Sequence, residues 1–297
     1  MVRGYLRAQR DAILANDPGV RDGDPDAVHD MRVATRRLRS TLRTFRPLLD
    51  AARSEPVRDE LQWLGGVLGG VRDSQVMTRR LTEAVAAEPV ELVVGPVATQ
   101  LRRRLAARTT DARERLNEAL DSHRYAALLD ALDEVADAPP PTRPTRGRLL
   151  RLARKALRRA DLRLESADRA GRPPAGHVAL PLPSGAGRDV RMHEARKAYK
   201  RARYAVETLA PLAGRPARRL AKALTKLQDV LGAHQDSIVT GQLLRELGMQ
   251  AHLDGQNAFT YGLLHARQHE AGEASLRALP KARRRANARK VRRWLRA

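Results

Sequence analysis

The chain has 297 residues, 42% of them apolar but only 3% aromatic, and 57 Lys and Arg residues against 34 Asp and Glu give a net charge of +23. A core made mainly of Leu, Val and Ala suits close-packed helices better than a β-sandwich. The absence of cysteine excludes disulfides and thiolate metal sites, and the charge indicates a polyanionic partner such as nucleic acid, polyphosphate or anionic lipid. Without an apolar run of about 18 residues or a leader-like apolar stretch, we expect a cytoplasmic protein with no membrane contact.

The first helices along the chain lead to one with two distinct faces. Residues 1–16 predict a short helix, and Asp24-Pro25 then supply an N-cap and a first-turn proline for a helix that runs to about residue 50. Its mostly apolar stripe consists of Val28, Met31, Thr35, Leu38, Leu42, Phe45 and Leu49. A basic stripe, shifted by one residue and hence by about 100°, consists of His29, Arg32, Arg36, Arg39, Arg43 and Arg46. Because the basic stripe contains no acid, we predict that it binds anions while the other face is buried.

The rest of the first half predicts further helices separated by glycine and proline. We expect helices over residues 54–70, 74–88, 97–120 and 125–135. Gly69-Gly70 should end the first of these. The proline-rich residues 138–146 read as a linker. We therefore divide the chain into a first helical bundle, 1–137, and a second, 147–297, which closes with a basic C-terminal tail.

The second half predicts helices over residues 148–165, 189–209, 217–232, 234–247, 254–270 and 273–295. The Gly- and Pro-rich residues 167–188 predict a loose excursion between the first two.

Two blocks of the first half recur in the second. The segment from Met192 to Tyr204 repeats the two-faced helix, pairing His29 with His193, Arg32 with Arg196 and Arg39 with Arg203. Its apolar stripe becomes Met192, Ala195, Tyr199, Ala202, Val206 and Leu209. The block from Leu64 to Asp73 likewise aligns with that from Leu227 to Asp236. Two blocks in the same order indicate an internal duplication of domain size.

The motif His-Asp-Met-Arg-Val-Ala-Thr-Arg-Arg-Leu-Arg at residues 29–39, followed by a Leu-Gly-x-x-Arg-Asp block and a degenerate second copy, resembles the CHAD domain, the conserved histidine α-helical domain. The resemblance spans essentially the whole chain. It implies an all-α fold of two bundles related by a pseudo-twofold axis, with a basic cavity between them. It also implies that the partner is inorganic polyphosphate and that the protein targets or organises polyphosphate granules, with other granule proteins as further partners.

The roles of the histidines and of two repeated acids stay open at this point. His29 and His193 could donate to phosphate, could be structural residues positioned by the following carboxylate, or could ligate a metal. Asp73 and Asp236 read more readily as helix caps, and otherwise as carboxylates that orient a nearby His or Arg.

We predict a non-catalytic anion-binding protein with no cofactor and no metal, because no P-loop, zinc motif, cysteine nucleophile or pair of acids for magnesium is present. The predicted polyphosphate-binding residues are His29, Arg32, Arg36, Arg37, Arg39, Arg43, His193, Arg196, Lys197, Lys200, Arg201 and Arg203. The alternative is a basic nucleic-acid-binding helical protein, which the charge alone would support. Scarce aromatics for base stacking speak against it, so we expect nucleic acid to be only a weaker competitor.

Overall fold

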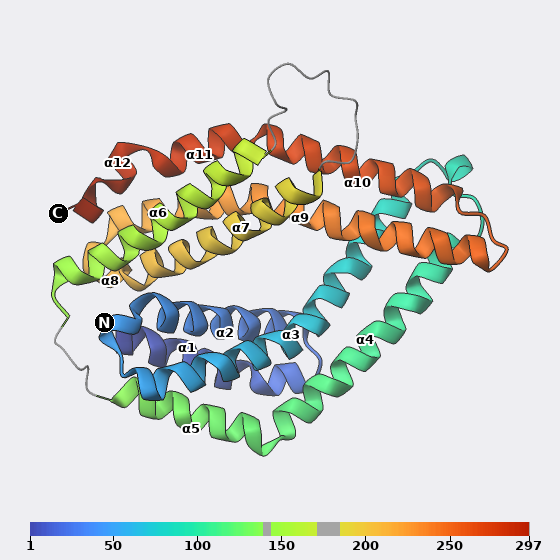
Figure 1. Ribbon diagram of the computed structural model, residues 1–297. Helices are drawn as coiled ribbons and strands as arrows, with labels where there is room; N and C mark the ends of the chain where they lie inside the picture. The colour runs from blue at the N-terminus through green and yellow to red at the C-terminus, as the bar shows by residue number, and fades with distance from the viewer. Residues whose placement is uncertain (139–143, 171–184, 297) are drawn as a thin grey trace. The chain divides into compact units, whose positions relative to one another are not determined.

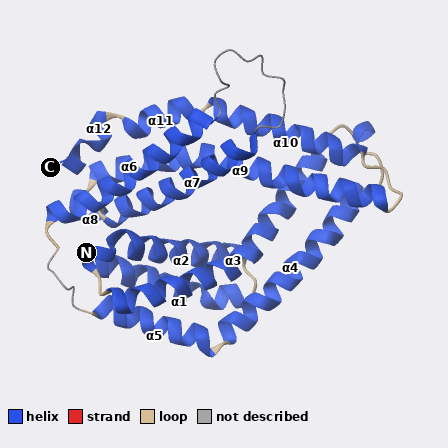
Figure 2. Ribbon diagram, in the orientation of Figure 1, coloured by secondary structure: helices blue, strands red, loops and turns tan. Residues whose placement is uncertain are grey.

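The computed structural model describes residues 1–138, 144–170 and 185–296, and within these ranges all regular structure is helical, with no strand (Figures 1 and 2). The all-α prediction is thereby confirmed. The first half contains α1 (Val2–Arg21), α2 (Pro25–Phe45), α3 (Ala51–Ala86), α4 (Val97–Asp121) and α5 (His123–Asp137), with the short turns η1 (Arg46–Leu48) and η2 (Val90–Leu92). The second half contains α6 (Arg146–Ala170), α7 (Gly185–Thr208), α8 (Ala210–Ala213), α9 (Arg215–Leu253), α10 (Phe259–Arg277), α11 (Leu279–Asn287), α12 (Arg289–Arg292) and η3 (Arg293–Arg296).

The chain forms two compact units that do not follow its linear order. The amino-terminal unit combines Val2–Thr142 with Val239–His269, and the carboxy-terminal unit combines Arg143–Ile238 with Glu270–Ala297 and Met1. The helices α9 and α10 therefore each contribute residues to both units. This division into compact units does not test the internal duplication. The duplication, its pseudo-twofold axis and the boundary between residues 1–137 and 147–297 therefore stay predictions.

In the amino-terminal unit, α2 lies between α1 and α3, and α5 runs along α1 and α3 (Figure 1). Asp24 caps α2 as predicted, because its side chain accepts a hydrogen bond from the amide of Asp26 at 2.9 Å. The apolar stripe of α2 is buried against these neighbours, except that Leu49 lies past the end of the helix and is half-buried. Burial of this stripe fixes which way the basic stripe of α2 faces.

One part of the amino-terminal unit is built from two distant segments of the sequence. The last turns of α3 and the start of α4 share one buried apolar cluster with α9 and α10. The cluster consists of Leu81, Val85, Val97, Leu101, Leu105, Leu243, Leu244, Leu247, Ala251, Tyr261 and Leu264. The Thr260 hydroxyl donates to the carbonyl of Leu92 at 2.9 Å and accepts from the amide of Val94 at 2.8 Å. Residues 239–269 thus complete the core of the amino-terminal unit.

The predicted helix stops at Gly69-Gly70 and after Gly232 are wrong. The helix α3 runs unbroken for 36 residues and α9 for 39, and neither Gly69, Gly70 nor Gly232 has positive φ. These glycines instead let neighbours approach: a Cβ on Gly69 would lie 3.4 Å from Arg32 Nη2, and one on Gly232 would lie 3.7 Å from Arg196 Nε. Packing on both sides of the long helices overrides the local stop signal.

Other predicted boundaries shift by a turn or fall outside the described residues. The first helix continues through Pro18 to Arg21. The break predicted between residues 270 and 273 lies instead at Ala278, between α10 and α11. Residues 139–143 of the predicted linker and residues 171–184 of the predicted excursion lie outside the described ranges.

In the carboxy-terminal unit, the basic C-terminal helices are fastened to α6 by ion pairs. Arg292 donates to both carboxylate oxygens of Asp161, at 2.6 and 3.1 Å, and the hydroxyl of the fully buried Tyr199 donates to the same carboxylate at 2.8 Å. Arg283 bridges to Asp168 at 2.7 Å and to Glu165 at 3.1 Å. Part of the predicted basic tail is therefore structural, and α6 supplies its counter-charges.

Candidate functional site

The first basic surface consists of His29, Arg32, Arg36, Arg37, Arg39 and Arg43, all from α2. His29, Arg39 and Arg43 are exposed, and the other three are half-buried. Because the adjoining apolar stripe of α2 is buried against α1 and α3, these cations are held along one side of the unit. The sequence prediction of a two-faced helix is confirmed here.

The middle of this surface has more positive charge than its surroundings neutralise. Among the described residues, neither Arg36 nor Arg43 has an acid within ion-pair distance or a hydrogen-bond partner. Arg39 donates to a neutral group, Gln62 Oε1 on α3, at 2.5 Å. Partial burial, and then the charge of Arg43, lowers the pKa of Arg39 below its ordinary value, with Arg36 adding to the effect. An anion placed among these guanidiniums would relieve that repulsion.

At one end of the first basic surface, His29 lies near Arg72, a cation from α3. The pKa of His29 is lowered by partial desolvation and, next, by the positive charge of Arg72. No acid and no hydrogen-bond partner holds its imidazole among the described residues. The nearest charges are Arg72 and Arg32 on the positive side and Asp30 and Asp26 on the negative side. This arrangement fits the reading of His29 as a donor to an anion better than the reading in which a carboxylate positions it.

Asp73 is not a helix cap, contrary to the preferred reading. It lies within α3, and its carboxylate pairs with Arg32 Nη2 at 3.1 Å. In the second half, Asp236 lies within α9 and approaches Arg196 Nη2 at 4.0 Å. Each Arg also crosses its partner helix over a glycine, Gly69 or Gly232. Both acids therefore orient an Arg of the repeated motif, which was the other reading.

The second basic surface consists of His193, Arg196, Lys197, Lys200, Arg201 and Arg203, all from α7. Its members are half-buried, apart from the exposed Lys197. Lys197 pairs with Glu194, which lowers the pKa of that carboxyl, and Arg203 Nε lies 3.5 Å from Glu207 Oε1. His193 Nδ1 lies 2.9 Å from Gln235 Oε1 on α9. Like the first, this surface combines one His with five cations, but more of its charge is balanced by carboxylates on its own helix.

The two surfaces share contacts at aligned positions. Arg39 bonds to Gln62 on α3, and its counterpart Arg203 donates to Thr225 on α9 at 3.3 Å. The aligned pairs Arg32–Asp73 and Arg196–Asp236 behave likewise. The recurring contacts agree with the duplication that the repeated sequence motif predicts.

The residues that α3 and α9 bring to the two basic surfaces are not among the predicted site residues. Arg72 lies beside His29, and Gln235, its aligned residue, bonds to His193. The available signal was their place immediately before Asp73 and Asp236 in the repeated block. No local pattern could show that α3 crosses α2 at that point.

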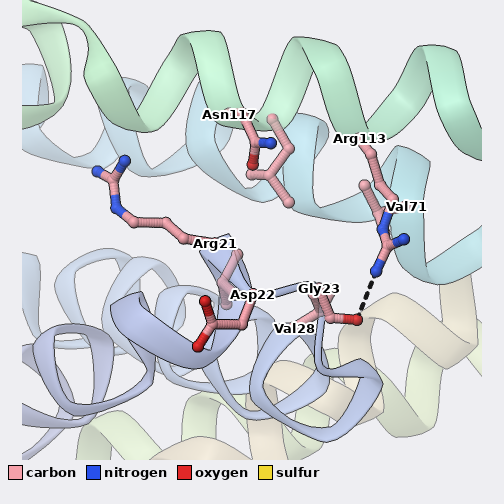
Figure 3. Close-up of a pocket in the computed structure, with 9 residues that line it drawn as sticks. Arg21, Asp22, Gly23, Val28, Val71, Arg113 and Asn117 are labelled. Atoms are coloured by element: carbon pink, nitrogen blue, oxygen red, sulfur yellow. Dashed lines mark hydrogen bonds between the residues drawn. The ribbon is translucent and has the colours of Figure 1, made fainter.

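A small cavity of about 140 Å³ lies among α1, α2, α3 and α4 (Figure 3). It is lined by Val20, Arg21, Asp22, Gly23, Val28, Val71, Arg113, Leu116 and Asn117. Arg113 donates to the carbonyl of Gly23 at 2.6 Å, and Arg21 is paired with Asp17 at 2.6 Å. Since its cations are already engaged, we assign this cavity to packing between α1 and α4.

Two features are absent from the described residues. No helix there has the length and apolar character needed to cross a bilayer. No cluster of three or more His, Cys, Asp or Glu side chains lies there in an arrangement able to hold a metal ion.

Comparison with known proteins places this geometry in a family. Two proteins of Mycobacterium tuberculosis, the uncharacterized proteins MT2285 (strain CDC 1551 / Oshkosh) and Rv2226 (strain H37Rv), are each 33% identical to this chain over 302 residues, covering 96% of it and 54% of their own length. The chain thus spans about half the length of the curated relatives it matches. The solved structure of PptA from Streptomyces chartreusis matches with a TM-score of 0.75 and 26% identity, over 95% of this chain and 97% of that one. The family model described as the CHAD domain matches residues 4–245, so this chain belongs to the CHAD domain family.

Proposed function

We propose that this protein binds inorganic polyphosphate without hydrolysing it, through the first and second basic surfaces, and that it is thereby recruited to polyphosphate granules in the cytoplasm. The observation that carries the proposal is the row of guanidiniums at Arg36, Arg39 and Arg43, none of which forms an ion pair with an acid among the described residues. Membership of the CHAD family, which is associated with polyphosphate, supports this choice of anion.

The chemistry of the surfaces suits a flexible chain of phosphates. Guanidinium groups stay charged and donate pairs of parallel hydrogen bonds to phosphate oxygens. Successive residues of the basic stripe of α2 are three or four positions apart, so they rise by about 4.5–6 Å along the helix. A polyphosphate chain presents anionic oxygens on every unit and can follow such a row, whereas a duplex would have to meet it with a rigid backbone. In the first surface, His29 and Arg72 extend the row onto the next helix.

The non-catalytic part of the proposal rests on the residues beside the cations. Enzymes that transfer phosphoryl groups hold magnesium with carboxylates close to the phosphates. The acids near the first basic surface are Asp73, which is engaged with Arg32, Asp30 and Asp26 beside His29, and Asp59, which is paired with Arg58 and acts on Arg39. Adding magnesium and long-chain polyphosphate should therefore release no phosphate above a blank. Sustained release that scales with protein concentration would overturn this part.

Competition between polyanions tests the choice of ligand. We expect long-chain polyphosphate to displace labelled duplex DNA at far lower phosphate concentration than the reverse, at the same salt concentration. Binding should weaken steeply as salt rises, because each phosphate contact releases a counterion. Equal displacement in both directions would favour the nucleic-acid alternative.

A further inference from the structure

A cationic pocket lies in the carboxy-terminal unit where α11 and α12 meet α9. Its volume is about 480 Å³. Its lining consists of Ala223, Lys281, Arg284, Arg285, Ala288, Lys290 and Val291. We call it the C-terminal pocket.

The local geometry explains how four cations come to line one pocket. Arg284 and Arg285 follow Lys281 by three and four residues, so all three lie on one side of α11. Ala288 has extended backbone, with φ −55° and ψ 130°, which ends α11 and starts α12. That bend brings Lys290 into the same lining, and the small side chains of Ala223 and Ala288 leave the space open.

The charges of the C-terminal pocket have no internal counter-ion. No acid is part of its lining, and none of Lys281, Arg284, Arg285 or Lys290 makes an ion pair or hydrogen bond among the described residues. The part of α9 beside the pocket adds positive charge. The exposed Arg219 lies four residues before Ala223 and the exposed Lys226 three residues after it, on the same side of the helix.

A neighbouring cavity of about 820 Å³ shows the contrasting case. Its lining includes Glu165 and Asp168, and these two acids hold Arg283 of α11 by ion pairs. Arg283, which holds α11 to α6, is thus neutralised. The four cations of the C-terminal pocket make no such ion pair among the described residues, although Arg284 also borders the neighbouring cavity.

The C-terminal pocket is separate from the second basic surface. Thr225, which accepts from Arg203 of α7, is two residues from Ala223 and therefore about 200° round α9. The pocket's cations also lie beyond residue 245, where the match to the family model ends. Binding here would need neither the first nor the second basic surface.

We propose that the C-terminal pocket is a distinct site for a compact, multiply charged phosphate anion of the size of tripolyphosphate. Its volume falls in the range of small-molecule sites. A single phosphate carries only about two negative charges, which leaves part of the charge of the four lining cations unbalanced, whereas a short phosphate chain carries several charges within that space. The two arginines can each bind a phosphate bidentately, and the two lysines add point charges.

Calorimetric titration of the full chain with tripolyphosphate, at about 0.15 M salt, tests this site. The pocket variant replaces Lys281, Arg284, Arg285 and Lys290 with Gln. The matched control replaces Arg103, Arg115, Arg159 and Arg245 with Gln, four exposed and dispersed cations that make no ion pair. A third variant replaces Arg32, Arg36, Arg39 and Arg43 with Gln. All four pocket side chains are exposed, so the pocket variant should fold, which circular dichroism checks. The double variant Arg284→Gln, Lys290→Gln serves as a milder second test.

We expect the pocket variant to lose about tenfold or more of the affinity for tripolyphosphate, and the double variant to lose part of it. The control and the third variant should stay within about threefold of the parent. Weak or absent binding by the parent would overturn the proposal, as would equal affinity in the pocket variant and the control. Loss in the third variant alone would also overturn it, while leaving the polyphosphate function of the first basic surface intact. Conversely, a pocket variant that loses tripolyphosphate but keeps long-chain polyphosphate supports two separate sites.

Discussion

Single side chains decide how much of each basic surface is available to a ligand. Arg36 and Arg43 have no acidic partner among the described residues, whereas Lys197 and Arg203 each have a carboxylate on their own helix. The last two pairings follow from spacing in the sequence, at three and four residues. The bond of Arg39 to Gln62 does not, because it depends on how α2 crosses α3. The residue types of the site could therefore be predicted, but their degree of neutralisation could not.

The lowered pKa of His29 makes a pH dependence of binding testable. In the free protein, His29 protonates below its ordinary value of about 6.5, and a bound anion should raise that pKa again. Affinity for polyphosphate should therefore rise as pH falls from 7.5 to 5.5, by up to about tenfold for this one group. The variant His29→Gln should flatten the rise, and His123→Gln, at an exposed position at the start of α5, should not.

The same shift has a consequence for stability that can be measured without ligand. The unfolded chain takes up this proton more readily than the folded one, so the His29 contribution lowers stability as pH falls below about 6.5. Thermal unfolding of His29→Gln should lose less stability on acidification than the parent. An unchanged pH profile for both binding and unfolding would contradict the assigned environment of His29.

At the scale of helices, glycine was the least reliable guide in the sequence. Where Gly69 and Gly70 read as a stop, α3 continues and uses Gly69 to admit Arg32. The positive-φ glycines are others, such as Gly23 and Gly214, which do end helices. The distinction depends on which surface lies opposite each glycine, and a single sequence does not contain that information.

Substitution of Gly70 by Ala tests the continuous α3. A Cβ there would meet the Cβ of Ala112 at 3.6 Å, an ordinary van der Waals contact. In a helix interior Ala is favoured over Gly by about 0.5–1 kcal/mol, so Gly70→Ala should raise the free energy of unfolding measured with urea by about that amount. If Gly70 ended a helix in the left-handed region, the same substitution would destabilise the protein.

Arg292 should matter more to stability than its neighbour Arg293. Arg292 binds both oxygens of the carboxylate that also accepts from buried Tyr199, and both partners are mostly shielded from solvent. Its replacement by Gln should cost about 1–3 kcal/mol in urea unfolding. Arg293 is exposed and makes no such pair, so Arg293→Gln should change stability by less than about 0.5 kcal/mol. Equal effects would mean that η3 and α12 are not fastened to α6.

For the molecule as a whole, the periodicity of apolar residues predicted the all-α fold class. It could not predict which helices pack together. The buried stripe of α2 and its copy on α7 are as expected, because both arise from the same three- and four-residue spacing. The joining of residues 239–269 to the amino-terminal unit was not expected, since it depends on α9 running past the predicted break. Arg72 was missed for a similar reason, because α3 brings it to His29 from a distant part of the sequence.

The most direct test of the central claim is whether the position of a cation matters for binding polyphosphate, or only its charge. One variant reverses Arg32, Arg36, Arg39 and Arg43 to Glu, and the other reverses Arg103, Arg115, Arg159 and Arg245, with the same change in net charge. Long-range effects are screened beyond about 8 Å at physiological salt, while charged hydrogen bonds of about 1.5–3 kcal/mol each are lost only in the first variant. With both variants helical by circular dichroism, we predict that the first loses at least about 100-fold in affinity for long-chain polyphosphate and the second less than about tenfold. Equal losses would contradict the account, because they would mean that the first basic surface is an ordinary solvated helix face.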